Sequence, residues 1–333
     1  MKILKFGGTS VANPEGLTRV IEIIKKNTEQ LIIVVSAFGG VTNLLIEMAE
    51  QASKSNNNYK KNIKTIEEIH LNQINFFIPV KQQSGIISFL KSKINELEDF
   101  LESLNTLKEL TQKSLSKISS FGEILSSTII FHVLKDSNLD ADIADSRDIL
   151  FTHKVNDREV INNKKSAKKT SLLLKNKKSK IIVMPGFIAQ DEEGNITTLG
   201  RGGSDYTASL LANYADANIL EIWTDVSGVY TANPKLVSQA QPIKKLSFQE
   251  AMELSHFGAK VIYPPTLQPL IEKNIPLRIK NTFDTSAKGT LINQNNLKKD
   301  ENSIVKGVSH IENVSLVNLE GSGMVGIPGF SKR

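Results

Sequence analysis

Short apolar segments, each followed at once by a glycine-containing polar loop and then by a helical pattern, most constrain the fold of this chain. Residues 31–35 are continuously apolar and mostly β-branched, as in a parallel strand that is buried on both faces. They lead into a loop at 36–40 and a helical pattern over 41–52. Ile3–Phe6 precedes Gly7–Ser10 in the same way. This repetition predicts an α/β fold with a mostly parallel sheet and ligand-binding loops at the carboxyl ends of its strands.

The rest of the chain supplies further elements of the same kind. Asn13 and Pro14 mark a helix start, because Asn is a preferred cap and Pro fits the first helical position. Residues 54–119 are polar but carry helical apolar spacing, which indicates a helical excursion on the sheet rather than a separate domain. Strands are expected at 142–144, 181–184, 220–225, 277–280 and 290–292, a hairpin at 187–199, helices at 120–134, 160–174 and 206–215, and a capping box at 247–250.

The charge balance indicates an ordinary solvated surface. The 333 residues include 41 Lys and Arg against 35 Asp and Glu, which gives a net charge of +6. Lysine runs at 163–165 and 175–178 carry much of the excess, but they lack the clustered arginines and interleaved aromatics of a nucleic-acid surface. We therefore expect no nucleic-acid partner. Hydrophobic residues make up 40% of the chain, enough for a sizeable core.

The cysteine content and the hydropathy of the chain indicate the cellular compartment of the protein. The chain has no cysteine, which excludes disulfides, thiolate catalysis and cysteine–zinc sites. No apolar run approaches the ~20 residues of a membrane span. Residues 1–6 fit a first strand rather than a signal peptide. The sequence predicts a cytoplasmic protein with no membrane association.

The stretch from Thr197 to Asp205 is the clearest candidate ligand site. Its three glycines let the backbone approach a ligand closely and adopt positive φ. Ser204 or Asp205 is expected to cap the following helix, whose first N–H groups favour an anion. Arg201 adds a planar guanidinium suited to a carboxylate or a phosphate. The stretch therefore predicts an anion site.

Several predicted strands end in loops that combine glycine with Ser, Thr or Lys. Such loops suit a polyphosphate held by backbone N–H groups and lysines. The chain has no Gly-x-x-x-x-Gly-Lys-Ser/Thr loop, no complete dinucleotide fingerprint and no histidines at ligand spacing, so no protein metal site is predicted. Lys5 lies inside an apolar strand and needs a charged partner. Phosphoryl transfer to a carboxylate fits this inventory, because the acceptor is already ionised and needs no strong base.

Six motifs occur in the order found in aspartate kinases. They are Lys5–Ser10, Val35–Ala37, Phe121–Glu123, Gly200–Asp205, Thr224–Tyr230 and Gly258–Lys260. The chain resembles the aspartate kinase family over residues 1–292. The resemblance implies the amino-acid kinase fold, a three-layer α/β/α sandwich around a mostly parallel central sheet.

The same resemblance implies a reaction and its catalytic residues. The reaction is ATP-dependent phosphorylation of the side-chain carboxylate of L-aspartate to 4-phospho-L-aspartate, the first step toward threonine, methionine and lysine. Lys5 would neutralise the transferring phosphoryl group, and Asp205 is the second implied catalytic residue. Arg201 would bind a substrate carboxylate, assisted by Ser36, Thr42 and Ser204. Glu123 and Asp205 would bind the ammonium group or help to hold the site.

The resemblance also implies a nucleotide pocket. Its residues would be Gly7, Gly8, Thr9, Thr224, Asp225, Tyr230, Lys235 and Lys260, with Mg²⁺ bound through the nucleotide phosphates. Lys235 stands where the family often has Arg, so it keeps the charge but loses bidentate phosphate contact. Tyr263 stands where His is frequent in the family.

The end of the chain resembles the start of the regulatory ACT region of bifunctional aspartate kinase–homoserine dehydrogenases. We expect a linker at 293–303 and an incomplete ACT-like segment at 304–333, with strands at 304–309 and 314–319 and a helix entry at Gly321. The segment is too short to bury a core alone. The chain is therefore expected to be a fragment or a truncated protein, and a homo-oligomer if partner chains complete the region.

Two other interpretations remain at this level. One is an enzyme of the same fold with a different acceptor, such as a glutamate derivative, carbamate or a nucleotide. The other is a non-catalytic subunit that senses ATP or an amino acid. Arg201 with Glu123 favours an amino acid as the acceptor.

Overall fold

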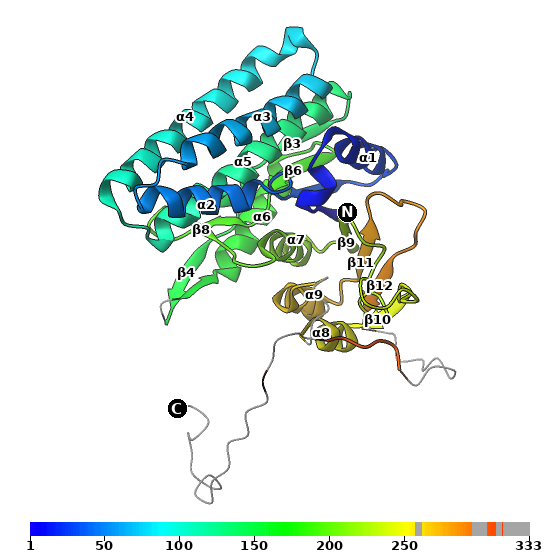
Figure 1. The fold of residues 1–333 in the computed structure, drawn as a ribbon. Helices are drawn as coiled ribbons and strands as arrows, with labels where there is room; N and C mark the ends of the chain where they lie inside the picture. The colour runs from blue at the N-terminus through cyan, green and yellow to red at the C-terminus, as the bar shows by residue number, and fades with distance from the viewer. Residues whose placement is uncertain (157, 257–261, 295–304, 311–314, 316–333) are drawn as a thin grey trace, which may run out of the picture.

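An eight-stranded sheet forms the centre of the computed structural model, which describes residues 1–156, 158–256, 262–294, 305–310 and 315 (Figure 1). Its strands lie in the order β10-β12-β11-β9-β1-β2-β6-β3, and neighbours are parallel except β11 and β12. The strands are β1 (Lys2–Phe6), β2 (Leu31–Val35), β3 (Ala141–Ile143), β6 (Ile181–Pro185), β9 (Ile219–Thr224), β10 (Lys245–Ser247), β11 (Leu277–Asn281) and β12 (Thr290–Asn293). The mostly parallel sheet is confirmed.

Helices cover both faces of this sheet, so the expected three layers are confirmed. Side chains alternate along each strand: Leu4 and Phe6 enter one apolar cluster, and Ile3 enters the other. The first face carries α1 (Pro14–Lys25), α2 (Val41–Ser53) and α5 (Gln112–Asp136). The second carries α6 (Asn163–Asn176), α7 (Gly203–Tyr214), α8 (Phe248–His256) and α9 (Gln268–Lys273).

The predicted helical excursion forms an outer layer on helices rather than on the sheet. It consists of α3 (Tyr59–Phe77) and α4 (Gln83–Leu107), joined by the 3-10 turn Val80–Gln82. Both pack on α2 and α5, in the upper left of Figure 1. Leu97, Leu101 and Leu104 are buried there, so their helical spacing reflects core packing.

Two small hairpins lie outside the main sheet. The predicted hairpin at 187–199 is confirmed as β7 (Ile188–Gln190) and β8 (Ile196–Thr198). The second pairs β4 (Thr152–Val155) with β5 (Arg158–Ile161). The prediction of a helix from residue 160 was wrong, because Val160 pairs with His153 in this hairpin and the helix begins after the Asn162 cap.

The start of α5 was also predicted wrongly. The helix begins at Gln112, where the Thr111 side chain accepts a hydrogen bond from Ser114 N, instead of at Ser120. Leu115 and Ile118 continue the helical spacing before Phe121, so the helix extends further toward the N-terminus than predicted. As a result Glu123 lies inside the helix, not in its first turn.

The described C-terminal residues contact α8 and the loop after β9. Val308 N donates to Thr231 O at 2.8 Å, and Lys306 pairs with Glu250 at 2.7 Å. The predicted strand at 304–309 was wrong for its described part, since residues 305–310 are not in a strand. The predicted helix entry at Gly321 lies outside the described residues, as does the strand at 314–319 apart from Ser315.

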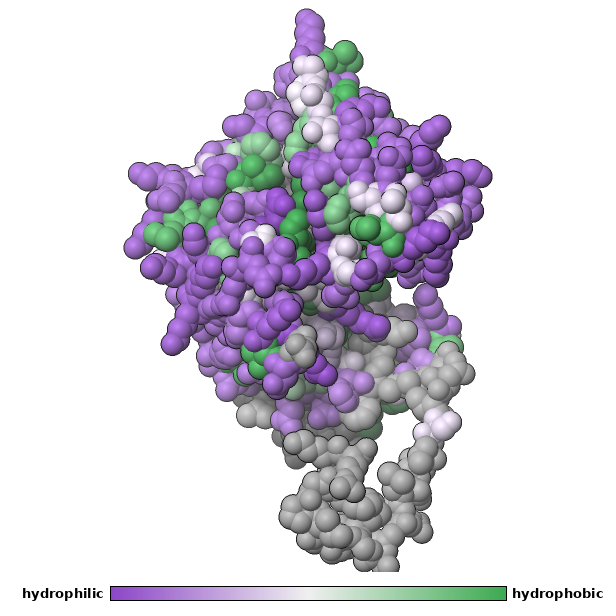
Figure 2. Space-filling view, turned by 90° about the vertical axis from the view of Figure 1, so that its left-hand side faces the viewer, coloured by the Kyte–Doolittle hydropathy of each residue, from purple (hydrophilic) through white to green (hydrophobic). Residues whose placement is uncertain are grey.

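One face of the molecule is largely polar. Figure 2 shows hydrophilic residues over most of one face, with apolar residues in small separate groups. Among the described residues, no helix is both long enough and apolar enough to cross a membrane.

Candidate active site

The carboxyl ends of β2, β1 and β9 bring three predicted loops to one edge of the sheet. The strands are in parallel register, with Phe6 beside Val35 and Trp223. Gly7 N donates to Trp223 O at 3.1 Å, and Ser36 N donates to Phe6 O at 3.2 Å. The predicted phosphate, substrate and nucleotide loops therefore start side by side.

Lys5 forms an ion pair with Asp205 across this edge. Lys5 Nζ lies 2.6 Å from Asp205 Oδ1, and the two side chains are only 10% and 17% exposed. Lys5 projects from β1 toward α7, which packs against this strand and carries Asp205 in its first turn. The expectation that Lys5 needs a charged partner is confirmed. A pair this poorly solvated leaves a costly lone charge when either partner is lost.

The glycine loop before α7 depends on left-handed backbone. Gly200 and Gly202 have φ of 72° and 64°, and Gly202 caps the helix without a side-chain hydrogen bond. The prediction that Ser204 or Asp205 caps α7 was wrong, because the helix starts earlier and both residues lie in its first turn. Arg201 is exposed between the two glycines.

Ser204 is buried against the end of β6. A Cβ on Gly186 would lie 2.6 Å from Ser204 Cβ, so only glycine allows this approach. Similarly, a Cβ on Gly202 would lie 2.6 Å from Tyr263 Cβ. The Tyr263 side chain thus packs directly on the glycine loop.

Glu123 projects from α5 toward the loop after β2. It is 3% exposed, and its Oε1 accepts from Ala37 N at 3.3 Å. Burial raises the pKa of this carboxyl to about 8, although the Ala37 N–H and the charge of Lys5 act in the opposite direction. Within the described residues its Oε2 has no hydrogen-bond partner. The carboxyl group is therefore mostly protonated at neutral pH. A cation that binds beside it would favour its ionised form.

The loop that carries Ser36 is held by close contacts. Ser126 Oγ donates to Ser36 O at 2.9 Å, and a Cβ on Gly8 would lie 2.9 Å from Ala37 O. Thr42 follows in the first turn of α2 and is half-buried. Ser36 and Thr42 thus flank a segment that is fixed on several sides.

The predicted nucleotide residues are partly gathered at this edge. Gly8 and Thr9 begin a 3-10 turn, Gly8–Val11, and Thr9 is exposed. Thr224 Oγ1 donates to Asp225 Oδ1 at 3.1 Å at the end of β9. Tyr230 and the exposed Lys235 lie in the segment between β9 and β10, whereas Lys260 lies outside the described residues.

Two residues that join these loops were missed from the sequence. Ser10 Oγ lies 2.7 Å from Thr282 Oγ1 and donates to Trp223 O at 3.2 Å. All three groups are buried. Ser10 belongs to a motif that we singled out, but nothing near Thr282 indicated that β11 ends at the same place.

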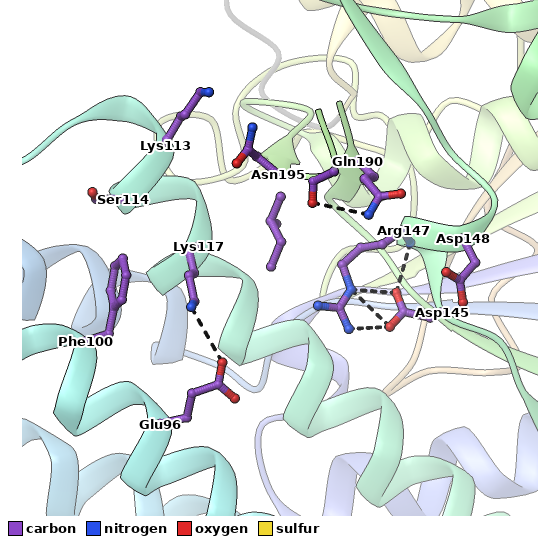
Figure 3. Close-up of a pocket in the computed structure, with 12 residues that line it drawn as sticks. Glu96, Phe100, Lys113, Ser114, Lys117, Asp145, Arg147, Asp148, Gln190 and Asn195 are labelled. Carbon is purple, nitrogen blue, oxygen red and sulfur yellow. Dashed lines mark hydrogen bonds and ion pairs between the residues drawn. The ribbon is translucent and has the colours of Figure 1, made fainter. Parts of the chain in front are cut away.

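The cavity shown in Figure 3 lies away from this edge and has a volume of about 730 Å³. It is lined by α4, α5, the 3-10 turn Ser146–Asp148 and the β7–β8 hairpin. Its charged groups are largely satisfied by one another: Arg147 pairs with Asp145, and Lys117 lies 3.7 Å from Glu96. This cavity contains none of the predicted site residues and does not need a ligand to balance its charge.

Known proteins match both the sequence and the fold. The amino acid kinase family matches residues 1–281. A bifunctional aspartokinase/homoserine dehydrogenase of Buchnera aphidicola is 38% identical over 326 residues, which cover 96% of this chain and 40% of that protein. Lysine-sensitive aspartokinase 3 of Escherichia coli is 32% identical over 336 residues, which cover 98% of this chain and 71% of that protein.

A solved structure agrees with these matches. The crystal structure of E. coli aspartokinase III in complex with aspartate and ADP superposes with a TM-score of 0.81 at 30% identity, covering 88% of this chain and 64% of the other. The chain spans 36–41% of the length of the bifunctional relatives. The matches extend over nearly the whole of this chain, and their folds agree with the sheet described above. The chain therefore belongs to the amino acid kinase family and, within that family, to the aspartokinases.

Proposed function

We propose that this chain transfers the γ-phosphoryl group of ATP to the side-chain carboxylate of L-aspartate. The observation that carries the proposal is the convergence of the Lys5–Asp205 pair and the buried Glu123 at the carboxyl edge of β1 and β2. The E. coli relative binds aspartate and ADP, as its crystal structure states. A site for an amino acid beside a phosphate needs cations, an acid and backbone N–H groups, and this edge supplies all three.

The proposed substrate residues supply a cation, an acid and hydroxyl groups. Arg201 is exposed on the glycine loop and can rotate onto the α-carboxylate as a bidentate donor. Glu123 would receive the ammonium group and ionise as it does so. Ser36, Thr42 and Ser204 would supply hydroxyl groups around the acceptor.

The phosphoryl group would lie over β1. The Lys5 ammonium group would interact with the γ-phosphate as well as with Asp205. The phosphate oxygens carry the negative charge in the transition state of phosphoryl transfer. Asp205 would then fix the lysine ammonium in direction rather than neutralise it. Gly7 and Gly8 would allow the phosphates to approach the backbone, as small loops at strand ends do.

The nucleotide would extend from this point across the end of β9. Thr224, Asp225 and Tyr230 would line its path, with Lys235 and Lys260 as further cations. Mg²⁺ would arrive on the phosphates, because no group of three His, Asp or Glu among the described residues could hold it alone. The ion would supply charge neutralisation for the triphosphate.

A coupled ADP-release assay tests the proposal. ADP release by the wild-type chain should depend on aspartate, and Lys5→Met should reduce turnover at least about 100-fold, since charge stabilisation is usually the largest catalytic contribution. Asp205→Asn should reduce it as well, with circular dichroism confirming that both variants fold. A matched exposed ion pair provides the control: Lys60→Met on α3 removes the partner of Glu102 on α4 and should leave turnover unchanged.

The proposal is overturned if ADP release is the same with and without aspartate, or if both site variants retain wild-type turnover. Tight binding of ATP and aspartate without turnover would instead support the sensing subunit.

A further inference from the structure

The outer helix α3 reaches the loop that carries Ser36. His70 on α3 and Phe38 in this loop have their ring centroids 5.1 Å apart, with planes inclined by 42°. His70 is 0% exposed and Phe38 is 1% exposed. This contact joins the helical excursion, which carries none of the predicted site residues, to the candidate substrate loop.

The polar atoms of His70 make it an unfavourable core residue. Its Nδ1 lies 2.6 Å from Ile66 O and must donate, since a carbonyl oxygen only accepts. Nε2 is then the unprotonated nitrogen, and within the described residues it has no hydrogen-bond partner. An unsatisfied buried acceptor is costly, and a leucine at this position would avoid that cost. The hydrogen bonding of the ring therefore does not by itself account for a histidine in the helix layer.

The loop is held on its other sides by groups that belong to the candidate site. Glu123 accepts from Ala37 N, and a Cβ on Gly122 would lie 2.8 Å from Ala37 Cβ. Phe38 O accepts from Val41 N at 3.0 Å, where α2 begins. The segment between Ser36 and Thr42 is thus held on both sides of Phe38, whose ring contacts His70.

The geometry points to His70 as a positioning residue for the aspartate site, acting through Phe38 on the loop at 36–42. Its ring orients the Phe38 ring, and the Ile66 hydrogen bond orients the His70 ring. The inference rests on the proposed function for the identity of the substrate. It makes α3 a determinant of substrate affinity although no residue of α3 is placed at the substrate.

Hydrogen–deuterium exchange tests, without any ligand, whether His70 positions the loop at 36–42. His70→Leu should accelerate amide exchange of residues 36–42, whereas His70→Phe, which keeps an aromatic ring, should restore much of the protection. The control Leu101→Ala removes a buried side chain of α4 and should lower global stability without a selective effect on this loop. Equal exchange of 36–42 in wild type and His70→Leu overturns the inference.

Kinetics tests the consequence for aspartate. In His70→Leu the KM for aspartate should rise about tenfold, with a smaller change in kcat and none in the KM for ATP, because the variant loosens the substrate loop alone and a misplacement of about 1 Å can cost on the order of 100-fold. An unchanged KM for aspartate, or an equal rise for ATP, contradicts the positioning role. A wild-type chain without aspartate-dependent turnover contradicts the proposed function instead. The exchange experiment still tests whether His70 positions the loop at 36–42.

Discussion

Glu123 is proposed to bind an ammonium group as a carboxylate, yet its buried position favours the protonated, neutral form. Burial raises the pKa of its carboxyl to about 8, so the free protein holds a proton there at pH 7. An ammonium group beside the carboxylate would reverse this preference, because an opposite charge favours the ionised form. Substrate binding and proton release are then linked at a single residue.

This linkage can be measured by calorimetry. Aspartate binding at pH 7 should release close to one proton, seen as a dependence of the apparent binding enthalpy on the ionisation enthalpy of the buffer. Glu123→Gln should bind aspartate more weakly and release none. Binding to the wild-type chain with no net proton release would exclude Glu123 as the ammonium partner.

His70 makes a separate contribution to the pH dependence of stability. Burial lowers its pKa to about 4, against 6.5 in an unfolded chain. The folded state therefore binds fewer protons between these values, and this contribution is present above pH 6.5 and is lost as pH falls toward 4. The loss should approach about 3 kcal/mol, because a tenfold change in a proton-binding constant corresponds to roughly 1.4 kcal/mol. Urea denaturation at pH 7 and pH 4 should show this loss in wild type and a smaller one in His70→Leu. A parallel decrease in the two proteins would refute it.

At the scale of elements, the glycine loop before α7 shows a constraint that composition alone does not reveal. Gly202 and Gly194 both have positive φ, 64° and 87°, but only Gly202 faces another side chain at close range. Gly194→Ala should therefore cost only the backbone strain, about 1–2 kcal/mol. Gly202→Ala adds a clash with Tyr263 and should cost more, with a large loss of kinase turnover. Equal unfolding free energies for the two variants, measured in urea, would contradict this account.

The elements were predictable where a local pattern fixes them. Leu31–Val35, the Asn13 cap and the Ser247–Glu250 capping box all appear as expected, and both hydrogen bonds of that box form, at 2.8 and 3.1 Å. The prediction for the start of α5 was too late, because Leu115 and Ile118 continue the helical spacing before Phe121.

The candidate site was predictable only in part. The motif loops predicted Lys5, Asp205 and Ser36 as neighbours, and the structure pairs Lys5 with Asp205 and joins Ser36 to the end of β1. The buried contacts that join the loops, Ser10 with Thr282 and His70 with Phe38, connect residues far apart in the sequence. No local spacing encodes contacts of this kind, because they depend on the packing of whole layers.

In the whole molecule, the site lies where the chain changes direction across the sheet. From β1 the order runs through β2 and β6 to β3 on one side, while β9 begins the other side. The chain after β1 passes to α1 on one face of the sheet and the chain after β9 passes to α8 on the other, an arrangement that favours ligand binding at the carboxyl ends of these strands. The two sides also differ in their proposed roles. The loop after β2 carries the substrate residues Ser36 and Thr42, and the segment after β9 carries nucleotide residues such as Thr224.

The central place of β1 also has a consequence for how the protein is made. The strand is synthesised early, yet Lys2 pairs with Ile219 on one edge, and that partner leaves the ribosome much later. Until then the chain can assemble β1, β2 and the helical layers above them while one edge of β1 stays open. Such long-range pairing slows folding and exposes a strand edge to aggregation. Asp205 also lies far from Lys5 in the sequence, so the proposed catalytic pair can form only after β1, β2, β3 and β6 have been synthesised.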